Sequence, residues 1–203
     1  MEAVRLASNR VYEAGEVIGR ACADDPLLAY IVPDRAERTR QALAAAGHVL
    51  VRFGLRFGSV DVVGSPIDGV VISLAPMHLL AVPLRIAWTL QAAIGLGLPP
   101  AGLIRLSRVA FQTGRAARRA VPPPHHRLLL LAVNPAQRGQ GVDAALLRSV
   151  LRHADAAGRP CVTATGSAHT VLFLSAHGFQ VVADHGLPGA GLRLWTLVRL
   201  PQK

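Results

Sequence analysis

The chain has 203 residues, 51% of them hydrophobic, and a formal charge of +10 at pH 7. This length and composition are enough for one well-buried core, so we expect a single globular domain over residues 1–203. The charge comes from scattered arginines, with Lys203 as the only lysine, and aromatic residues make up only 4% of the chain. Nucleic-acid modules instead group basic residues with stacking aromatics, so we expect no nucleic-acid partner.

The cysteines and the apolar stretches bear on the cellular compartment. Cys22 and Cys161 lie far apart without CxxC spacing, which favours a reducing cytoplasm over a disulfide framework or a metal site. The longest apolar stretch, residues 76–106, is interrupted by prolines and by Arg85. Only about 13 residues separate Arg85 from the Pro99-Pro100 pair, fewer than the roughly 20 needed to cross a bilayer. We therefore expect a cytoplasmic protein with buried helices and no membrane anchor or signal peptide.

Before residue 121 the sequence predicts helices and short strands. The residue before a proline is pushed out of helical geometry, so "ADDP" at 23–26 ends the first helix. The stretch "GSPIDG" has the turn residues of a hairpin between two β-rich runs. The expected elements are a strand at 3–7, helices at 11–23 and 35–57, strands at 59–63 and 69–74, and an apolar helical region reaching about Arg119.

After residue 121 strands and helices alternate. The run "LLLLAV" at 128–133 is apolar at every position, as expected for a strand that is covered on both faces. The helix that follows it carries a stripe of apolar residues and stops at Gly158 and Pro160. The expected elements are a strand at 128–133, a helix at 142–157, a strand at 161–165, a helix at 170–178, and strands at 179–183 and 192–200.

The stretch "VNPAQRGQGVDAALL", residues 133–147, joins the end of that apolar strand to the start of a helix. Free backbone N–H groups at a helix start carry partial positive charge, so this geometry suits a phosphate. Gly139 and Gly141 let the backbone approach a ligand closely, and Arg138 adds a full charge. A Walker loop is excluded because no GKS or GKT follows, and the GxGxxG dinucleotide spacing is absent.

These residues resemble the acetyl-CoA loop of the Gcn5-related N-acetyltransferases (GNAT), whose pattern is Arg or Gln, two residues, Gly, one residue, and Gly or Ala. Here the pattern begins at Arg138 and ends at Asp143 in place of the small residue. The similarity is tight from Pro124 to Phe179 and loose over nearly the whole chain. Four further stretches are similar to the branch that includes puromycin N-acetyltransferase: "ACADDP" at 21–26, "PHHRLLLLAVNP" at 124–135, "TVLFLSAHGFQVV" at 170–182 and "GLRLWTLVR" at 191–199.

The resemblance implies an α/β fold with a mixed central sheet, flanked by helices and splayed between the strands at 128–133 and 161–165. Residues 1–121 would form an acceptor-side half and residues 122–203 an acetyl-CoA half. Acetyl-CoA would be the cosubstrate and a small-molecule amine the acceptor, in a monomer or homodimer that needs no metal. The cosubstrate would bind the backbone of Leu131, Ala132 and Val133 and the amides of Arg138, Gly139, Gln140, Gly141, Val142, Asp143 and Ala144.

The catalytic positions depart from the family's pattern. Leu174 stands where the family has a tyrosine that protonates the departing thiolate, and Ala164 stands where it has a glutamate base. Thr170 replaces an asparagine that contacts CoA, and a threonine can still cap the helix and offer a hydroxyl. His125, at the family's Pro-His position, is the first candidate to replace the base, and a surface or capping role is the ordinary alternative for it.

Asp143 allows three interpretations. In the first, it is a favourable acid in the first helical turn and faces solvent, while the phosphates use neighbouring amides. In the second, its carboxylate competes with the pyrophosphate, because like charges 4 Å apart repel by roughly 1 kcal/mol in water and about 4 kcal/mol at an intermediate dielectric. In the third, the loop is shifted by one residue and neither description applies.

Acidic residues gather around Tyr30, where Asp24 and Asp25 are candidates to bind a cationic amine or to cap a helix. The apolar residues 76–106 would form the opposite wall, which favours a hydrophobic small molecule. Three functions follow. The chain is an N-acetyltransferase acting on a small amine, a GNAT-like protein that has lost acetyl transfer and binds a ligand or partner or catalyses another reaction, or a basic protein that binds a polyanion.

Overall fold

The computed structural model describes residues 1–34, 40–74, 76, 99–187, 189 and 191–202. Its helices are α1 (Val11–Ala21), α2 (Pro26–Ile31), α3 (Arg40–Phe57), α5 (Pro100–Ala120), α6 (Val142–Ala156) and α7 (Ala168–Ala176). Its strands are β1 (Val4–Arg5), β2 (Gly58–Val63), β3 (Gly69–Leu74), β4 (His126–Val133), β5 (Cys161–Thr165), β6 (Gln180–Leu187) and β7 (Leu192–Arg199).

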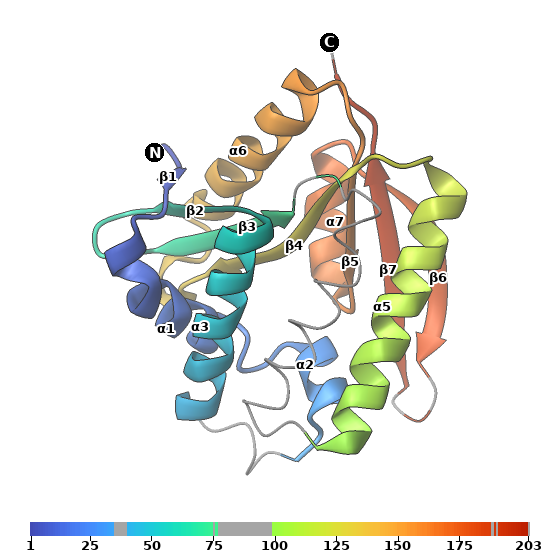
Figure 1. The fold of residues 1–203 in the computed structure, drawn as a ribbon, viewed down its shortest axis with the longest axis horizontal. Coiled ribbons are helices and arrows are strands. Elements are labelled where there is room, and N and C mark those ends of the chain that lie inside the picture. The colour runs from blue at the N-terminus through green and yellow to red at the C-terminus, as the bar shows by residue number, and fades with distance from the viewer. Residues whose placement is uncertain (35–39, 75, 77–98, 188, 190, 203) are drawn as a thin grey trace.

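Within the described residues, seven strands form one mixed sheet in the order β1-β2-β3-β4-β5-β7-β6. Among the described strands, only β4 and β5 run parallel, and every other neighbouring pair is antiparallel. Figure 1 shows α1, α3 and α5 on one face of the sheet and α6 and α7 on the other. The predicted α/β class, a mixed sheet flanked by helices, is confirmed.

β4 lies at the centre of the sheet and is covered on both faces, as its unbroken apolar sequence predicted. Leu128 and Leu131 pack with α6 and α7 in one hydrophobic cluster. Leu130 and Ala132 pack with α1 in a second cluster on the opposite face. Because both faces pack against helices, β4 holds the loop that follows it at a well-defined place in the fold.

α1 and α3 cross at small residues that cover the second face. A Cβ added to Gly47 would lie 2.3 Å from the carbonyl oxygen of Gly15, and a Cβ added to Gly15 would lie 2.7 Å from the backbone N of His48. The two backbones are therefore in direct contact, which only glycine permits at this crossing.

The structure differs from the sequence prediction mainly at helix ends. The first helix ends at Ala21 rather than at residue 23, and the unpredicted helix α2 follows because Asp25 caps it, with Oδ1 accepting from Leu28 N at 2.9 Å. Residues 35–39 of the predicted long helix, and 77–98 of the predicted apolar region, lie outside the described residues. In the parts of the chain that are described, none of the helices is both long enough and apolar enough to span a membrane.

Candidate functional site

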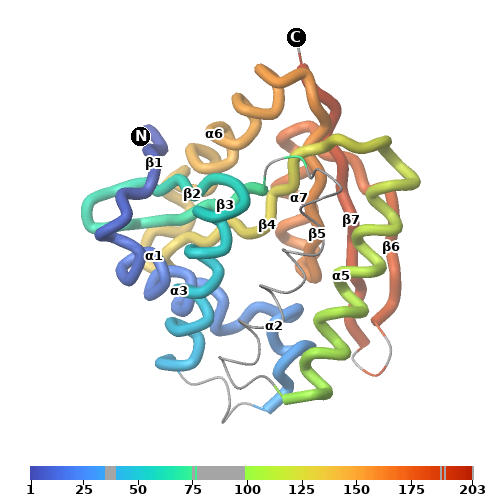
Figure 2. The backbone as a smooth tube through the Cα atoms, in the orientation of Figure 1, coloured from blue at the N-terminus to red at the C-terminus, as the bar shows by residue number. Residues whose placement is uncertain are grey.

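β4 and β5 are paired only at their starts. In the described structure two residue pairs are in register, His126 with Cys161 and Arg127 with Val162. Beyond them the two strands separate, which Figure 2 shows as diverging tubes between β4 and β5. This is the splay that the resemblance implied, and it opens toward the loop that joins β4 to α6.

An irregularity in β4 marks the point where the two strands part. The register of β4 against β3 shifts so that Leu129 is passed over between Leu128 and Leu130. Such a bulge bends a strand and interrupts its pairing. Thr163 Oγ1 donates to Leu128 O at 3.0 Å, so a side chain of β5 binds this carbonyl at the point where the strands part. The splay is thus built into β4 itself.

Backbone groups of β4 face the gap beyond this point. Asn134 N donates toward the β3 side, to Asp68 O at 2.8 Å. Since the direction of backbone groups alternates along a strand, those of Leu131 and Val133 point to the β5 side, where no described residue of β5 pairs with them. These two residues belong to the predicted pantetheine contacts, whereas Ala132 points its backbone groups toward β3.

The loop after β4 ends at the N-terminus of α6, as predicted. Gly139 and Gly141 have φ angles of +78° and +77°. A Cβ at either position would meet nothing within 4 Å, so backbone conformation rather than crowding calls for glycine there. Val142 is buried in the core and holds the first turn of α6 in place. The amides of this turn consequently face outward from a rigid support, the arrangement that suits an anion.

Asp143 is bound to this same helix end. Its side chain is half-buried, and Oδ1 accepts a hydrogen bond from Ala144 N at 2.8 Å. The half-exposed carboxylate therefore occupies one amide of this helix end, which is the contact through which it would compete with a pyrophosphate in the second interpretation.

Arg138 points from the loop toward the end of α1. Its guanidinium donates to Ala21 O at 3.4 Å. Beside this contact, burial raises the pKa of the Cys22 thiol to about 12, with Asp25 adding to the effect and Arg138 opposing it. Cys22 is accordingly a neutral thiol at pH 7, and Arg138 connects the loop with the turn between α1 and α2.

The two positions that the resemblance assigned to a tyrosine and a glutamate hold apolar side chains. Leu174 lies on the inner side of α7, is 2% exposed and packs against the core. Ala164 lies on the other face of the sheet, beside the cluster formed by Tyr30 and its neighbours. Thr170 is not the cap of α7, because Ser167 Oγ accepts from Thr170 N at 3.3 Å and the helix begins at Ala168.

The histidines differ in their surroundings. His125 immediately precedes β4, at the closed end of the splay, and β4 separates it from the loop at Gly139. Burial lowers the pKa of His125, and Arg127, Arg118 and His126 lower it further. His125 is therefore neutral at pH 7 and able to accept a proton. His177, by contrast, is engaged with its own helix, through a 2.8 Å hydrogen bond between Nδ1 and Phe173 O.

Within the described structure, Asp24 and Asp25 do not form an open carboxylate cluster. Asp25 caps α2, and Asp24 is exposed at the surface. Tyr30 is buried among apolar side chains, and Arg108 donates to its hydroxyl at 3.5 Å. Sequence reasoning did not anticipate Arg108, because no local pattern shows that α5 lies beside α2.

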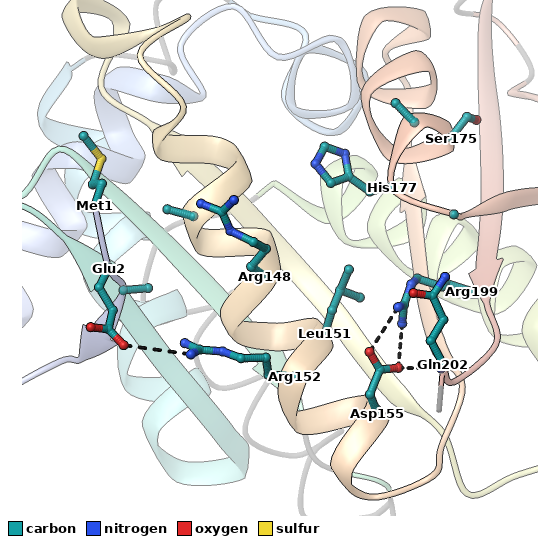
Figure 3. Close-up of a pocket in the computed structure, with 14 residues that line it drawn as sticks. Met1, Glu2, Arg148, Leu151, Arg152, Asp155, Ser175, His177, Arg199 and Gln202 are labelled. Carbon is teal, nitrogen blue, oxygen red and sulfur yellow. Dashed lines mark hydrogen bonds and ion pairs between the residues drawn. The ribbon is translucent and has the colours of Figure 1, made fainter.

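Two concave surfaces lie near the helices of this site. One, of about 470 Å³, borders the loop on the α1 and α3 side and is lined by Gly19, Arg20, Ala23, Arg40, Leu43, Asn134, Pro135 and Ala136. The other, of about 930 Å³, is a groove between α6 and the end of α7. Figure 3 shows Arg148 and Arg152 on one side of this groove and Arg199, paired with Asp155, on the other. Among the described residues, no group of three or more His, Cys, Asp or Glu side chains is placed to hold a metal ion.

Comparison with known proteins gives a fold but no close relative. No protein-family model and no curated protein sequence matches the chain. A histone acetyltransferase HPA2 and related acetyltransferase from Corynebacterium glutamicum superposes with a TM-score of 0.70 at 18% identity, over 100% of this chain and 97% of that one. Arylalkylamine N-acetyltransferase 2 from Aedes aegypti gives 0.71 at 13% identity, over 99% of each chain.

A third similar structure has a different description. The C-terminal condensation domain of Ebony, in complex with beta-alanyl-dopamine, superposes with a TM-score of 0.65 at 14% identity over 98% of each chain. Likeness at such low identity shows the fold and not the reaction. Together with the parallel, splayed pair of β4 and β5, these neighbours show that the chain has the GNAT fold.

Proposed function

We propose that the protein transfers an acetyl group from acetyl-CoA to the amine of a small hydrophobic molecule. The observation that carries this proposal is the gap between β4 and β5, which ends at the α6 N-terminus. The gap offers backbone groups of Leu131 and Val133 with which no described residue of β5 pairs, and the helix end offers amides beside Gly139 and Gly141. Acetyl-CoA has an extended arm that contains amides and a pyrophosphate at one end of it. The arm matches the backbone groups in the gap, and the pyrophosphate matches the amides at the helix end.

Acetyl-CoA, when bound, supplies an acetyl group activated as a thioester. The residues that would hold it are Leu131 and Val133 through their backbones, and Arg138 to Ala144 at the helix end. Holding two reactants in line accounts for a large share of the rate in such transfers, so the loss of a tyrosine and a glutamate is compatible with slow turnover. His125 is the residue we propose as the proton acceptor, because it stands at the Pro-His position of the resemblance, directly before β4, and its lowered pKa leaves it neutral at pH 7, although as a weaker base than an ordinary histidine.

The proposed acceptor is an apolar amine. Tyr30 is surrounded by Leu27, Ile31, Leu192 and Leu194, and Ala164 of β5 borders this cluster. The Aedes aegypti neighbour is an arylalkylamine N-acetyltransferase, so arylalkylamines are the first compounds to test. We propose that the enzyme acts in the cytoplasm as a monomer or homodimer, on a small molecule rather than a nucleic acid, and without a metal.

Asp143 favours a second candidate function. Its carboxylate occupies the amide of Ala144, where the pyrophosphate of acetyl-CoA would bind. In that case the chain keeps the GNAT fold, no longer transfers acetyl groups, and binds a ligand or partner or catalyses another reaction on the Tyr30 side of the sheet. The Ebony condensation domain, with beta-alanyl-dopamine bound, is a neighbour of the same fold that is not described as an acetyltransferase.

Calorimetric titration of acetyl-CoA separates the two candidates. The native protein, Asp143→Gly, and Asp24→Asn are compared, the last being a control that removes an exposed acid elsewhere. Micromolar binding by the native protein supports the acetyltransferase, and arylalkylamine turnover is then measured with His125→Ala alongside. Binding by Asp143→Gly alone supports the second candidate. If neither protein binds acetyl-CoA, the acetyltransferase proposal is wrong.

A further inference from the structure

α5 has an unusual charge for a helix of its length. It contains five arginines among its 21 residues and no aspartate or glutamate. A helix of this length is about 30 Å long. It lies at the outside of the molecule, alongside β7 and β6 in Figures 1 and 2, and one long side faces away from the sheet.

The outward side combines cations with large apolar side chains. Ile104 and Phe111 are 62% and 63% exposed, and Arg108, Arg115 and Arg118 are exposed as well. Their spacing of four and three residues places all five on one face of the helix. We refer to these five residues, together with the exposed Arg119, as the α5 outer face.

The opposite side of α5 packs against the core of the protein. The residues buried there are Gly102, Val109, Thr113, Ala116 and Ala117. Among the described residues, no acidic side chain forms an ion pair with the arginines of the α5 outer face. Within the part of the chain that the structure describes, the one side-chain hydrogen bond from this face runs from Arg108 to the hydroxyl of Tyr30. The positive charge of this face is therefore not neutralised within the described fold.

We propose that the α5 outer face docks onto an anionic phospholipid surface. Arginine forms paired hydrogen bonds to phosphate oxygens, and clustered basic residues are attracted to anionic leaflets. Ile104 and Phe111 lie among these arginines and can enter the boundary between headgroups and acyl chains. This contact is peripheral, so it differs from the membrane-spanning segment that the sequence argued against.

Two other occupants fit this face less well. A nucleic acid would use the arginines, but its phosphate backbone gains nothing from an exposed isoleucine, and α5 carries a single aromatic side chain for stacking. A second copy of the chain would bring like charges together across the interface, which is unfavourable. A lipid surface takes up both the charge and the apolar side chains.

Vesicle sedimentation tests the proposal with the full chain. The protein is mixed with vesicles of phosphatidylcholine alone and with vesicles that also contain phosphatidylglycerol, at low and high salt. The variants are Arg115→Gln with Arg118→Gln, and separately Phe111→Ser. The matched controls are Arg148→Gln with Arg152→Gln on α6, which removes the same charge, and Leu172→Ser, which removes an apolar side chain that is 72% exposed.

We expect salt-sensitive binding to the anionic vesicles only. The paired α5 arginine variant should weaken it about tenfold or more, since each basic residue near such a surface contributes to binding. Phe111→Ser should weaken it too, and both controls should bind as the native protein does. The proposal is overturned by equal binding to neutral vesicles, by equal losses in the controls, by no binding, or by a DNA duplex that displaces the protein from the vesicles at equal phosphate concentration.

Discussion

Asp143 and Ala144 are joined at the start of α6 by a hydrogen bond of 2.8 Å from the backbone N of Ala144 to Oδ1 of Asp143. The same amide belongs to the helix end that would hold a pyrophosphate. One carboxylate thus stabilises the helix and opposes the anion that the helix end would otherwise attract.

Replacing Asp143 should separate these two effects. Asp143→Ala is expected to lower the free energy of unfolding by about 0.5–1 kcal/mol, because the helix loses an acid in its first turn. The same change should tighten acetyl-CoA binding by about fivefold or more, because a like charge is removed. Urea denaturation and calorimetry measure the two quantities. Asp24→Ala is the control, and a variant that loses stability without gaining affinity would contradict the competition.

His125 should determine the acidic limb of the pH profile if it accepts the proton of the amine. Its neutral form is the active base, and burial lowers its pKa, so this form persists below the ordinary histidine value of about 6.5. We expect kcat/KM to stay level as pH falls to that value and to decline only below it. His125→Ala should remove this limb and most of the activity, whereas His169→Ala, at an exposed position, should leave both unchanged. If the acidic limb of the pH profile survives in His125→Ala, the proton acceptor is a different residue.

The pair of Arg199 and Asp155 should make stability depend on acid. Arg199 is 5% exposed, and its guanidinium donates to both oxygens of Asp155 at 2.7 and 3.0 Å. Hydrogen bonding from Arg199 lowers the pKa of Asp155, so its contribution to stability is complete above the unfolded value of about 3.9 and is lost as pH falls through the lower folded value.

At pH 7, Asp155→Asn should lower the free energy of unfolding by about 2–3 kcal/mol, because it leaves the buried guanidinium of Arg199 without its carboxylate. The partly exposed position of Asp155 keeps the loss at the lower end of what a buried ion pair costs. At a pH below the folded pKa of Asp155, the difference from the native protein should largely disappear. Urea denaturation at the two pH values measures this. Asp184→Asn, which removes the exposed partner of Arg193, serves as the control and should change stability little. An equal loss in both variants would show that the buried position of Arg199 is not the cause.

The crossing of α1 and α3 should not tolerate a methyl group. Gly47→Ala places a Cβ 2.3 Å from Gly15 O, and backbone atoms cannot move aside as a flexible side chain can. We expect a loss of about 1–3 kcal/mol in the free energy of unfolding. Gly186→Ala is the matched control, because a Cβ there meets nothing within 4 Å and its φ is not positive. It should leave stability unchanged or raise it slightly. If both variants behave alike, the helices are not held by backbone contact.

Local patterns in the sequence predicted several elements well. α6 begins at the predicted Val142, because glycine in the left-handed conformation at Gly141 precedes a regular apolar stripe. β5 coincides with the predicted run at 161–165, and β4 is buried on both faces as its composition indicated. These features depend on residues that are close in the chain. The resemblance to the GNAT family added the splay, which local patterns alone do not show.

Other features depended on packing between distant segments. α2 forms because Asp25 caps it and Tyr30 is buried against α5, although "ADDP" by itself predicted only a break. The contact of Arg108 with Tyr30 joins residues separated by 78 positions.

The sequence alone determined the alternation of strands and helices after residue 121 and the glycine loop before α6, because side-chain chemistry and local backbone preference are properties of short segments. Only the tertiary structure decided that Arg108 of α5 reaches the hydroxyl of Tyr30 and that the cations of α5 face outward. Those outcomes depend on which surfaces the fold brings together and which it leaves exposed.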